Sequence, residues 1–150
     1  MNAEMIDTPF RLRLVGKRGP VPDASYGPTG LKLMGQLWAA VCERDTATRG
    51  INHWVYLPGG EMFTGVELTD PSAGVEGLES LDVLLPRYLR AAHTGPYSEL
   101  PALWAGLRSH LARLGETPTA LGVEVYDHWC ENPAELRTTV LIGLERRADG

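Results

Sequence analysis

The chain has 150 residues and a formal net charge of −5, and 43% of its residues are hydrophobic, which suits a single globular domain. No run of five like charges occurs, and the acidic balance argues against direct binding to a nucleic-acid backbone. Because there is neither an apolar run of 18 residues nor an amino-terminal signal segment, we expect a cytoplasmic protein without a membrane contact.

The first half of the chain is predicted to have the order β-α-β-β. Residues 10–15 alternate apolar and polar side chains, as a half-buried strand does. Four Gly and three Pro predict a loop over residues 16–30. Apolar residues at three- and four-residue spacing then predict a helix over residues 31–44. Residues 51–57 and 61–68 are predicted strands on either side of a Pro-Gly-Gly turn.

The second half is predicted to repeat this order. Residues 81–92 are predicted to form one strand, and Pro86 within it indicates either an edge position or a later start of the strand. A helix is predicted over residues 98–114, with leucines along one face and a glycine after its end. Residues 123–126 and 136–145 are the last two predicted strands.

The two halves are predicted to be pseudo-repeats within a single domain, residues 1–150. The repeats cover about residues 10–68 and 81–145, and residues 69–80 link them. The predicted fold class is α+β, with an antiparallel sheet that carries both helices on one face. Two packed repeats of this kind also predict a ligand cleft between them.

Corresponding motifs support the duplication. The paired segments are His53-Trp54-Val55-Tyr56 with Val123-Glu124-Val125-Tyr126, Lys17-Arg18-Gly19-Pro20 with His93-Thr94-Gly95-Pro96, and Leu37-Trp38 with Leu103-Trp104. In this alignment the stretch from Pro20 to Trp38 is longer than the stretch from Pro96 to Trp104. The first half is therefore predicted to carry about ten extra residues in its Gly- and Pro-rich loop before the helix.

Glu124 is the main candidate for chemistry. Alternation along a strand places Val123 and Val125 on one face and Glu124 and Tyr126 on the other. With the valines against the helices, Glu124 and Tyr126 face the opposite, concave side of the sheet. The alternative is that this side is solvated and that Glu124 is an ordinary exposed residue.

By the repeat, Trp54 and Tyr56 face the same side as Glu124 and Tyr126. A carboxylate among aromatic rings suits an aromatic, cationic or amphipathic small molecule, because the rings supply contact area and cation–π attraction. These four residues are the predicted ligand-binding residues. If the chain is an enzyme, Glu124 and Tyr126 are the predicted catalytic pair, with the carboxylate acting as a general acid or positioning a water.

Other residues that could take part in catalysis or binding have simpler interpretations. Glu67 is a second carboxylate for which exposure is the favoured interpretation, and His93 is either a base or a turn residue at the end of a strand. Trp38 and Trp104 lie on the predicted helical stripes and are assigned to the core. No metal-ligand spacing, phosphate-binding glycine loop or nucleophile motif occurs, so no metal and no cofactor are predicted.

A set of motifs runs through the second half of the chain. They are Arg90-Ala91-Ala92-His93-Thr94-Gly95-Pro96-Tyr97, Leu103-Trp104, Gly122-Val123-Glu124-Val125-Tyr126, Glu131-Asn132-Pro133 and Glu135-Leu136-Arg137-Thr138. Together they resemble the GyrI-like small-molecule-binding family, which includes the effector-binding domains of AraC-type and MerR-type multidrug regulators. The match is good over residues 81–144 and looser over residues 10–19 and 31–68.

The resemblance implies a tandem β-α-β-β fold with a pocket between the repeats. It also implies that the glutamate of the Glu-x-Tyr strand, here Glu124, lies at the pocket base and selects cationic aromatic drugs. Because no DNA-binding helix-turn-helix fits the predicted helices, we expect a stand-alone member that senses or sequesters xenobiotics. Many members have an acidic residue where this chain has Thr139, which would leave one fewer carboxylate near the cleft.

The resemblance also leaves alternatives open. Some stand-alone members resemble hydrolases that open cyclopropane-bearing DNA-alkylating natural products through acidic and tyrosine groups, which would make Glu124 and Tyr126 catalytic. Others resemble inhibitor proteins that bind DNA gyrase. A small-molecule ligand is therefore the main predicted partner, while a gyrase-binding role and a homodimer are the alternatives.

Overall fold

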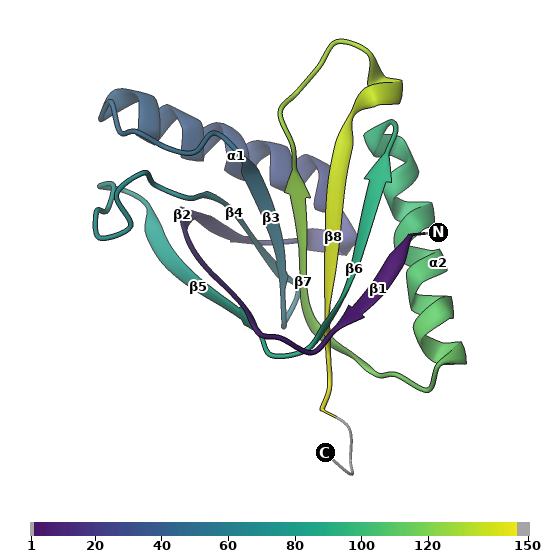
Figure 1. Ribbon diagram of the computed structural model, residues 1–150. Coiled ribbons are helices and arrows are strands. Elements are labelled where there is room, and N and C mark those ends of the chain that lie inside the picture. The colour runs from purple at the N-terminus through teal and green to yellow at the C-terminus, as the bar shows by residue number, and fades with distance from the viewer. Residues whose placement is uncertain (1, 147–150) are drawn as a thin grey trace. The chain divides into compact units, whose positions relative to one another are not determined.

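The computed structural model describes residues 2–146 and has an α+β fold of two α-helices and eight antiparallel strands over that range (Figure 1). The chain divides into two compact units. Unit 1 consists of Met1–Phe10 and Leu85–Gly150, and unit 2 consists of Arg11–Leu84. Each unit contains one strand-helix-strand-strand sequence and one additional strand, so the predicted tandem order is confirmed.

Unit 2 contains β2 (Phe10–Pro20), α1 (Tyr26–Glu43), β3 (Asn52–Leu57), β4 (Glu61–Val66) and β5 (Glu79–Leu85). Its strands are hydrogen-bonded in the order β3-β4-β2-β5. Gly59 and Gly60, in the tight turn between β3 and β4, both have a positive φ, a backbone conformation that residues with a side chain rarely adopt. This turn sets the register of the hairpin.

Unit 1 contains β1 (Ala3–Ile6), β6 (Tyr88–Thr94), α2 (Leu100–Arg113), β7 (Pro118–Tyr126) and β8 (Arg137–Leu144). Its strands are hydrogen-bonded in the order β1-β6-β8-β7. Strand β1 precedes unit 2 in the sequence but pairs with β6, so the chain returns to unit 1 after it has completed unit 2.

Each helix buries its apolar stripe on the sheet of its own unit, as the leucine spacing predicts. In unit 1 the buried cluster contains Leu89, Ala91, Leu107, Leu111, Val140, Ile142 and Leu144. In unit 2 it contains Val15, Leu37, Val41, Val66, Leu68 and Val75. The opposite faces of the strands are also buried, since Val55, Phe63 and Val123 are fully inaccessible to solvent.

The predicted loop over residues 16–30 is wrong. Residues 16–20 are the end of β2, and residues 26–30 are the first turns of α1. The glycines here are packing residues: a Cβ atom on Gly16 would overlap the backbone of β4, and one on Gly30 would overlap the ring of Trp54. Because residues 21–25 and 95–99 are connections of the same length, the predicted ten-residue insertion does not exist.

The predicted single strand over residues 81–92 is also wrong. It is two strands, β5 and β6, separated by Pro86 and Arg87. Pro86 has no N–H to donate to a strand ladder, which explains the break at this position. Strand β1 was not predicted from the sequence, because four residues are too few to show a periodicity.

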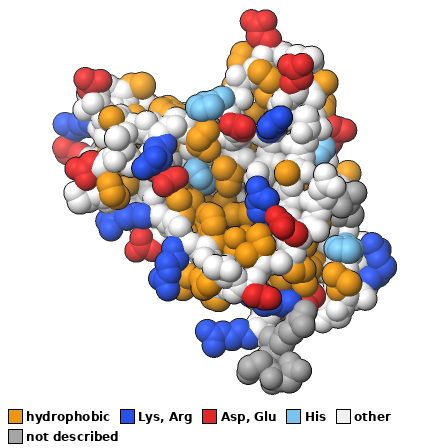
Figure 2. Space-filling model, viewed as in Figure 1, with side chains coloured by type: hydrophobic (Ala, Val, Ile, Leu, Met, Phe, Trp, Pro, Cys, Tyr) orange, Lys and Arg blue, Asp and Glu red, His pale blue; other side chains and the backbone are white. Residues whose placement is uncertain are grey.

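Positive and negative side chains are interspersed over the face shown in Figure 2, as expected for a chain whose charge imbalance is small. In residues 2–146, no helix has the length and apolar character that crossing a bilayer needs.

Candidate functional site

The carboxylate of Glu124 lies within unit 1 and is held by two side-chain donors. Glu124 is 3% exposed. Trp104 of α2 donates its indole N–H to Oε2 over 2.8 Å, and Tyr126 donates its hydroxyl to Oε1 over 2.5 Å. Because Glu124 and Tyr126 are two residues apart on β7, their side chains share a face of the strand. The site is therefore a buried carboxylate with neutral aromatic donors on both oxygens.

The predicted orientation of Glu124 is wrong. Its Cα partner on β8 is Val140, which belongs to the core beneath α2, and its hydrogen-bond donor Trp104 lies on α2 itself. Glu124 therefore faces the helix, and Val123 faces the other side. Alternation could not decide between these two orientations, because Val123 on the opposite face is as deeply buried as Glu124. The alternative of an exposed Glu124 is also wrong.

Aromatic rings surround the Tyr126 end of the site. Tyr97 packs edge-on against Tyr126, with ring centroids 5.3 Å apart and planes at 77°. Tyr97 lies in a short 3-10 segment before α2 and is 37% exposed, so it is the most exposed residue of this cluster. Burial raises the pKa of the Tyr97 phenol above its ordinary value, with a smaller contribution from Cys130. Tyr97 is therefore neutral, and its ring and hydroxyl are available to a ligand.

A cation already lies against one ring of this cluster. The guanidinium carbon of Arg108 is 5.3 Å from the centre of the Trp104 ring, within the range of a cation–π contact. Arg108 lies one helical turn after Trp104 on α2 and is exposed. The indole thus uses its N–H on Glu124 and its π face on a positive charge.

The predicted residues Trp54 and Tyr56 lie in unit 2, on the face of β3 that points to α1. The Trp54 ring rests against Gly30 of α1, where any side chain would overlap it, and Trp54 is 8% exposed. Tyr56 packs edge-on against Tyr26, with centroids 5.2 Å apart and planes at 84°. The Tyr26–Tyr56 pair of unit 2 thus has the same geometry as the Tyr97–Tyr126 pair of unit 1.

Thr139, which stands where related sequences are expected to be acidic, does not face Glu124. It is the Cα partner of Val125, whose side chain points to the opposite face of β7 from Glu124. An acidic residue at position 139 would therefore not lie beside Glu124 within unit 1. The expectation of one fewer carboxylate near the cleft stays a prediction.

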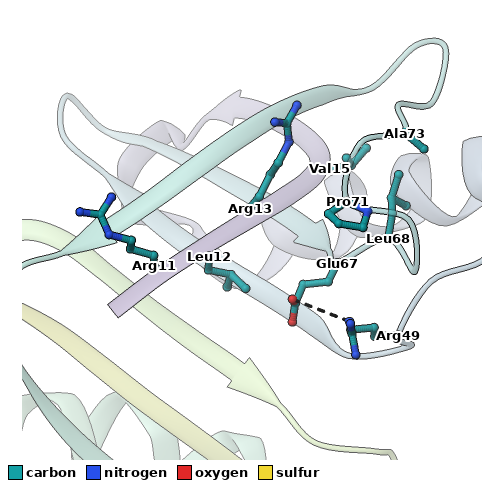
Figure 3. Close-up of a pocket in the computed structure, with 9 residues that line it drawn as sticks. All are labelled: Arg11, Leu12, Arg13, Val15, Arg49, Glu67, Leu68, Pro71 and Ala73. Carbon is teal, nitrogen blue, oxygen red and sulfur yellow. Dashed lines mark ion pairs between the residues drawn. The ribbon is translucent and has the colours of Figure 1, made fainter. Parts of the chain in front are cut away.

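A shallow surface pocket of about 220 Å³ lies in unit 2 and contains none of the four predicted ligand-binding residues. It is lined by Arg11, Leu12, Arg13, Val15, Arg49, Glu67, Leu68, Pro71 and Ala73. Glu67 and Arg49 form a loose ion pair of 3.9 Å with exposed side chains. Figure 3 shows the guanidinium groups of Arg11 and Arg13 pointing in different directions, away from this pair. Because its charges do not converge, the pocket offers no binding geometry for an anion.

Sequence reasoning missed two residues of the Glu124 cluster. Trp104 was assigned to the core, which accounts for its ring but not for the hydrogen bond that its indole N–H makes to Glu124. Tyr97 was seen only as part of a motif. Helical periodicity offers no signal for Tyr97, because this residue precedes the predicted helix over residues 98–114 and lies in the 3-10 segment before α2. Among residues 2–146, no three His, Cys, Asp or Glu side chains gather as a metal site.

Comparisons with known proteins support the fold. The sequence matches no family model and no curated protein. Solved structures nevertheless superpose over nearly the whole chain. EcmrR, in a cryo-EM structure of its DNA complex, matches with a TM-score of 0.69 and 16% identity over 97% of this chain. This chain spans 58% of the length of that EcmrR chain.

Two other solved structures are shorter proteins that the chain matches almost from end to end. SAV2435, determined with bound tetraphenylphosphonium, has a TM-score of 0.65 and 13% identity, covering 97% of this chain and 94% of its own. A hydrolase from Listeria innocua has a TM-score of 0.58 and 15% identity, covering 95% and 91%. At these identities the likeness establishes a shared α+β fold.

Proposed function

We propose that the protein binds an aromatic, cationic small molecule at Glu124 of unit 1, as a sensor or scavenger of xenobiotics. The observation that carries the proposal is the buried Glu124 carboxylate, whose two oxygens accept from the Trp104 indole and the Tyr126 hydroxyl. Burying a charge is costly unless it is paired, so a carboxylate retained in the interior of unit 1 is a candidate binding residue for a cation.

The aromatic groups around Glu124 support an aromatic ligand. The Tyr97 and Tyr126 rings meet edge-on, so a flat ligand can lie against one ring face while its positive charge approaches the carboxylate. Because Tyr97 is the exposed member of the pair, we infer that the ligand enters from its side. Trp54 and Tyr56 of unit 2 stay predicted ligand-binding residues by the repeat.

The family resemblance and the solved structures support the same proposal. The Glu-x-Tyr glutamate of the GyrI-like pattern is Glu124 here, and SAV2435, which shares the fold, was determined with a bound phosphonium cation. The resemblance to GyrI-like proteins therefore points to the residue that the burial and hydrogen bonds select independently.

A pair of probes that share a shape but differ in charge tests the proposal. Tetraphenylphosphonium and tetraphenylborate have four phenyl groups each and carry opposite charges. We expect Glu124→Gln to weaken phosphonium binding more than ~10-fold, the order for losing a charge partner in a buried site, and not to weaken borate binding. Isothermal titration and quenching of tryptophan fluorescence measure both affinities.

The exposed carboxylate of Glu76 in unit 2 provides the matched control. It forms an ion pair with the exposed Arg44, so Glu76→Gln removes the same charge from the protein without touching the site. We expect it to leave both affinities within about twofold of wild type, since exposed charges are screened by solvent. Equal phosphonium affinity in wild type and Glu124→Gln would show that Glu124 does not bind the cation.

A second candidate function is hydrolysis of a strained electrophile such as a cyclopropane conjugated to a carbonyl. The 2.5 Å hydrogen bond between Tyr126 and Glu124 favours it, because a carboxylate and a phenol in contact can accept a proton from water and donate one to the carbonyl oxygen. Mass spectrometry of a cyclopropane-bearing compound should then show a gain of one water. The rate should fall in both Glu124→Gln and Tyr126→Phe. A rate no greater than that in buffer would exclude this activity.

A further inference from the structure

A row of polar side chains crosses the sheet of unit 1 next to Glu124. Backbone pairing aligns His93 of β6 with Thr138 of β8, and aligns Thr138 with Tyr126 of β7. Directly paired residues point to the same face. This is also the face of Glu124, because its own partner on β8 is Val140, two residues after Thr138. Thr138 is thus a diagonal neighbour of Glu124, with Cα atoms about 7–8 Å apart.

The hydroxyl of Thr138 is buried and has no hydrogen-bond partner. Thr138 is 2% exposed, and no group within residues 2–146 bonds to its Oγ1 atom. Burying a hydroxyl without a partner destabilises a protein, so such groups are rare in native structures. Where one is retained, a functional role is the first explanation to consider.

Unit 2 shows that the fold does not need a polar residue at this position. The residue that pairs with Tyr126 is Thr138, and the residue that pairs with the corresponding Tyr56 is Met62. Met62 is fully buried. An apolar side chain is therefore accommodated at this position of the β-α-β-β unit. Unit 2 has its own buried threonine without a hydrogen-bond partner among residues 2–146, Thr64, but that residue pairs with Trp54, at the position that Val140 occupies beside Glu124.

His93 supplies a second polar atom in the same row. Its Nε2 atom is buried and makes no hydrogen bond within residues 2–146, although it lies 3.4 Å from Oε1 of Glu99. Gly95 allows this approach, because a Cβ atom there would overlap the Glu99 carboxylate and lie 3.2 Å from Nε2. Its φ of +145° is also strained for any other residue. The chain is thus built to keep the imidazole edge in this row.

We propose that Thr138 and His93 form a hydrogen-bonding subsite beside Glu124, which binds a hydroxyl group on the ligand. A hydroxyl both donates and accepts, and so matches a threonine hydroxyl on one side and an imidazole nitrogen on the other. The preferred ligand is therefore an aryl cation that carries a hydroxyl on its ring. This inference rests on the proposed function, because Glu124 is taken to bind the cationic end.

Two quaternary ammonium probes that differ by one hydroxyl test the subsite. They are phenyltrimethylammonium and (3-hydroxyphenyl)trimethylammonium. Wild type should prefer the hydroxylated probe by about three- to tenfold, the range that one or two neutral hydrogen bonds provide. In Thr138→Val this preference should disappear while the affinity for phenyltrimethylammonium stays unchanged. Thr138→Ser, which keeps the hydroxyl, should retain the preference.

Thr139→Val is the matched control, since it removes a hydroxyl from the adjacent residue on the opposite face of β8. It should keep the wild-type preference. Thr138→Val should also unfold at a higher temperature than wild type, because it removes a buried hydroxyl that has no partner. This second measurement shows that the variant is folded and that the hydroxyl is retained at a cost to stability.

The outcomes separate the two proposals. If wild type shows no preference, or if Thr138→Val keeps it, the subsite is wrong even when Glu124→Gln weakens both probes. If Glu124→Gln binds both probes as wild type does, the proposed cation site is wrong whatever Thr138 does. If neither probe binds to wild type, both proposals are wrong for this class of ligand.

Discussion

Units 1 and 2 each have a pair of tyrosines that meet edge-on, but they place different residues beside that pair. The pairs are Tyr97 with Tyr126 in unit 1 and Tyr26 with Tyr56 in unit 2. In unit 2 the strand carries Trp54, and the helix makes room for its ring with Gly30. In unit 1 the helix carries the tryptophan, Trp104, and the strand makes room with Gly122, where a Cβ atom would lie 2.8 Å from the ring. On that strand, Glu124 stands at the position that corresponds to Trp54 of unit 2, and it accepts the hydrogen bond from Trp104.

This difference teaches how a duplicated scaffold acquires a charged site. Both units pack tryptophan indoles between helix and sheet, Trp104 in unit 1 and Trp38 and Trp54 in unit 2. In unit 1 the Trp104 indole donates its N–H to the carboxylate of Glu124, whereas in unit 2 the Trp38 indole donates its N–H to the amide oxygen of Asn52 over 2.7 Å. The two units therefore differ in the acceptor that the strand offers to the helix tryptophan, a carboxylate in unit 1 and an amide in unit 2, without a change in the order of elements.

The largest expected effect concerns the ion pairs of the two units. In unit 1, Arg87 binds Glu116 with both η nitrogens, at 2.5 and 2.7 Å, and both side chains are nearly buried. In unit 2, Arg44 binds Glu76 at 2.7 Å, but both side chains are exposed. The hydrogen bonds to Glu116 raise the pKa of Arg87 further above its ordinary value, so Arg87 is charged at every pH at which the protein folds.

We expect Arg87→Met to lower the free energy of unfolding by about 3–5 kcal/mol, because it leaves Glu116 buried without its main partner. Arg44→Met should cost no more than about 1 kcal/mol, as is usual for an exposed pair. Urea unfolding followed by circular dichroism measures both. The double variant Arg87→Met with Glu116→Leu should recover most of the loss. If the double variant were as unstable as the single one, an unpaired charge would not be the cause.

The second prediction concerns the glycine that admits Trp54. Gly30→Ala should lower the free energy of unfolding by about 1–3 kcal/mol, because the added methyl group forces the Trp54 ring out of its place. Gly35 lies on the same helix with open space at its Cβ position, so Gly35→Ala should raise stability by about 0.5–1 kcal/mol through helix propensity. Thermal and urea unfolding check both signs. A stabilising Gly30→Ala would mean that the ring moves freely.

These glycines also show where sequence reasoning stops. The strand and helix patterns around Leu37 and Leu107 predicted the order of elements, because their spacing is a local property of the chain. The glycines at positions 16 and 30 were interpreted as loop residues, whereas each is a point of close approach to a distant segment. Composition cannot distinguish these two uses of glycine, since only one of them depends on tertiary structure.

The candidate site could likewise be predicted only as far as local sequence patterns determine it. Glu124 and Tyr126 are two residues apart on one strand, so alternation alone puts them together. The face to which they point depends on the helix that covers it, and the contribution of Trp104 depends on where α2 lies. The row of His93, Thr138 and Tyr126 depends on strand register, which no local pattern in the sequence records.

The smallest expected effect is a change in how the free energy of unfolding depends on pH, at another pair of corresponding positions. His53 of unit 2 corresponds to Val123 of unit 1, and both are buried. Burial lowers the pKa of His53 from its ordinary 6.5, against smaller opposing contributions from its contact with Ile51 and from the charge of Glu67. The folded state therefore binds a proton at His53 less readily than the unfolded state does.

Stability should accordingly fall as the pH drops below about 6.5, and the fall should end once the pH is below the lowered pKa of the folded state. His53→Val, which installs the unit 1 residue, should reduce this dependence between pH 8 and pH 5. Urea unfolding at a series of pH values measures the slope in both proteins, and the other histidines cancel in the difference because both proteins share them. Equal slopes in wild type and His53→Val would show that His53 becomes protonated without cost in the folded state, and that its burial does not distinguish the two units electrostatically.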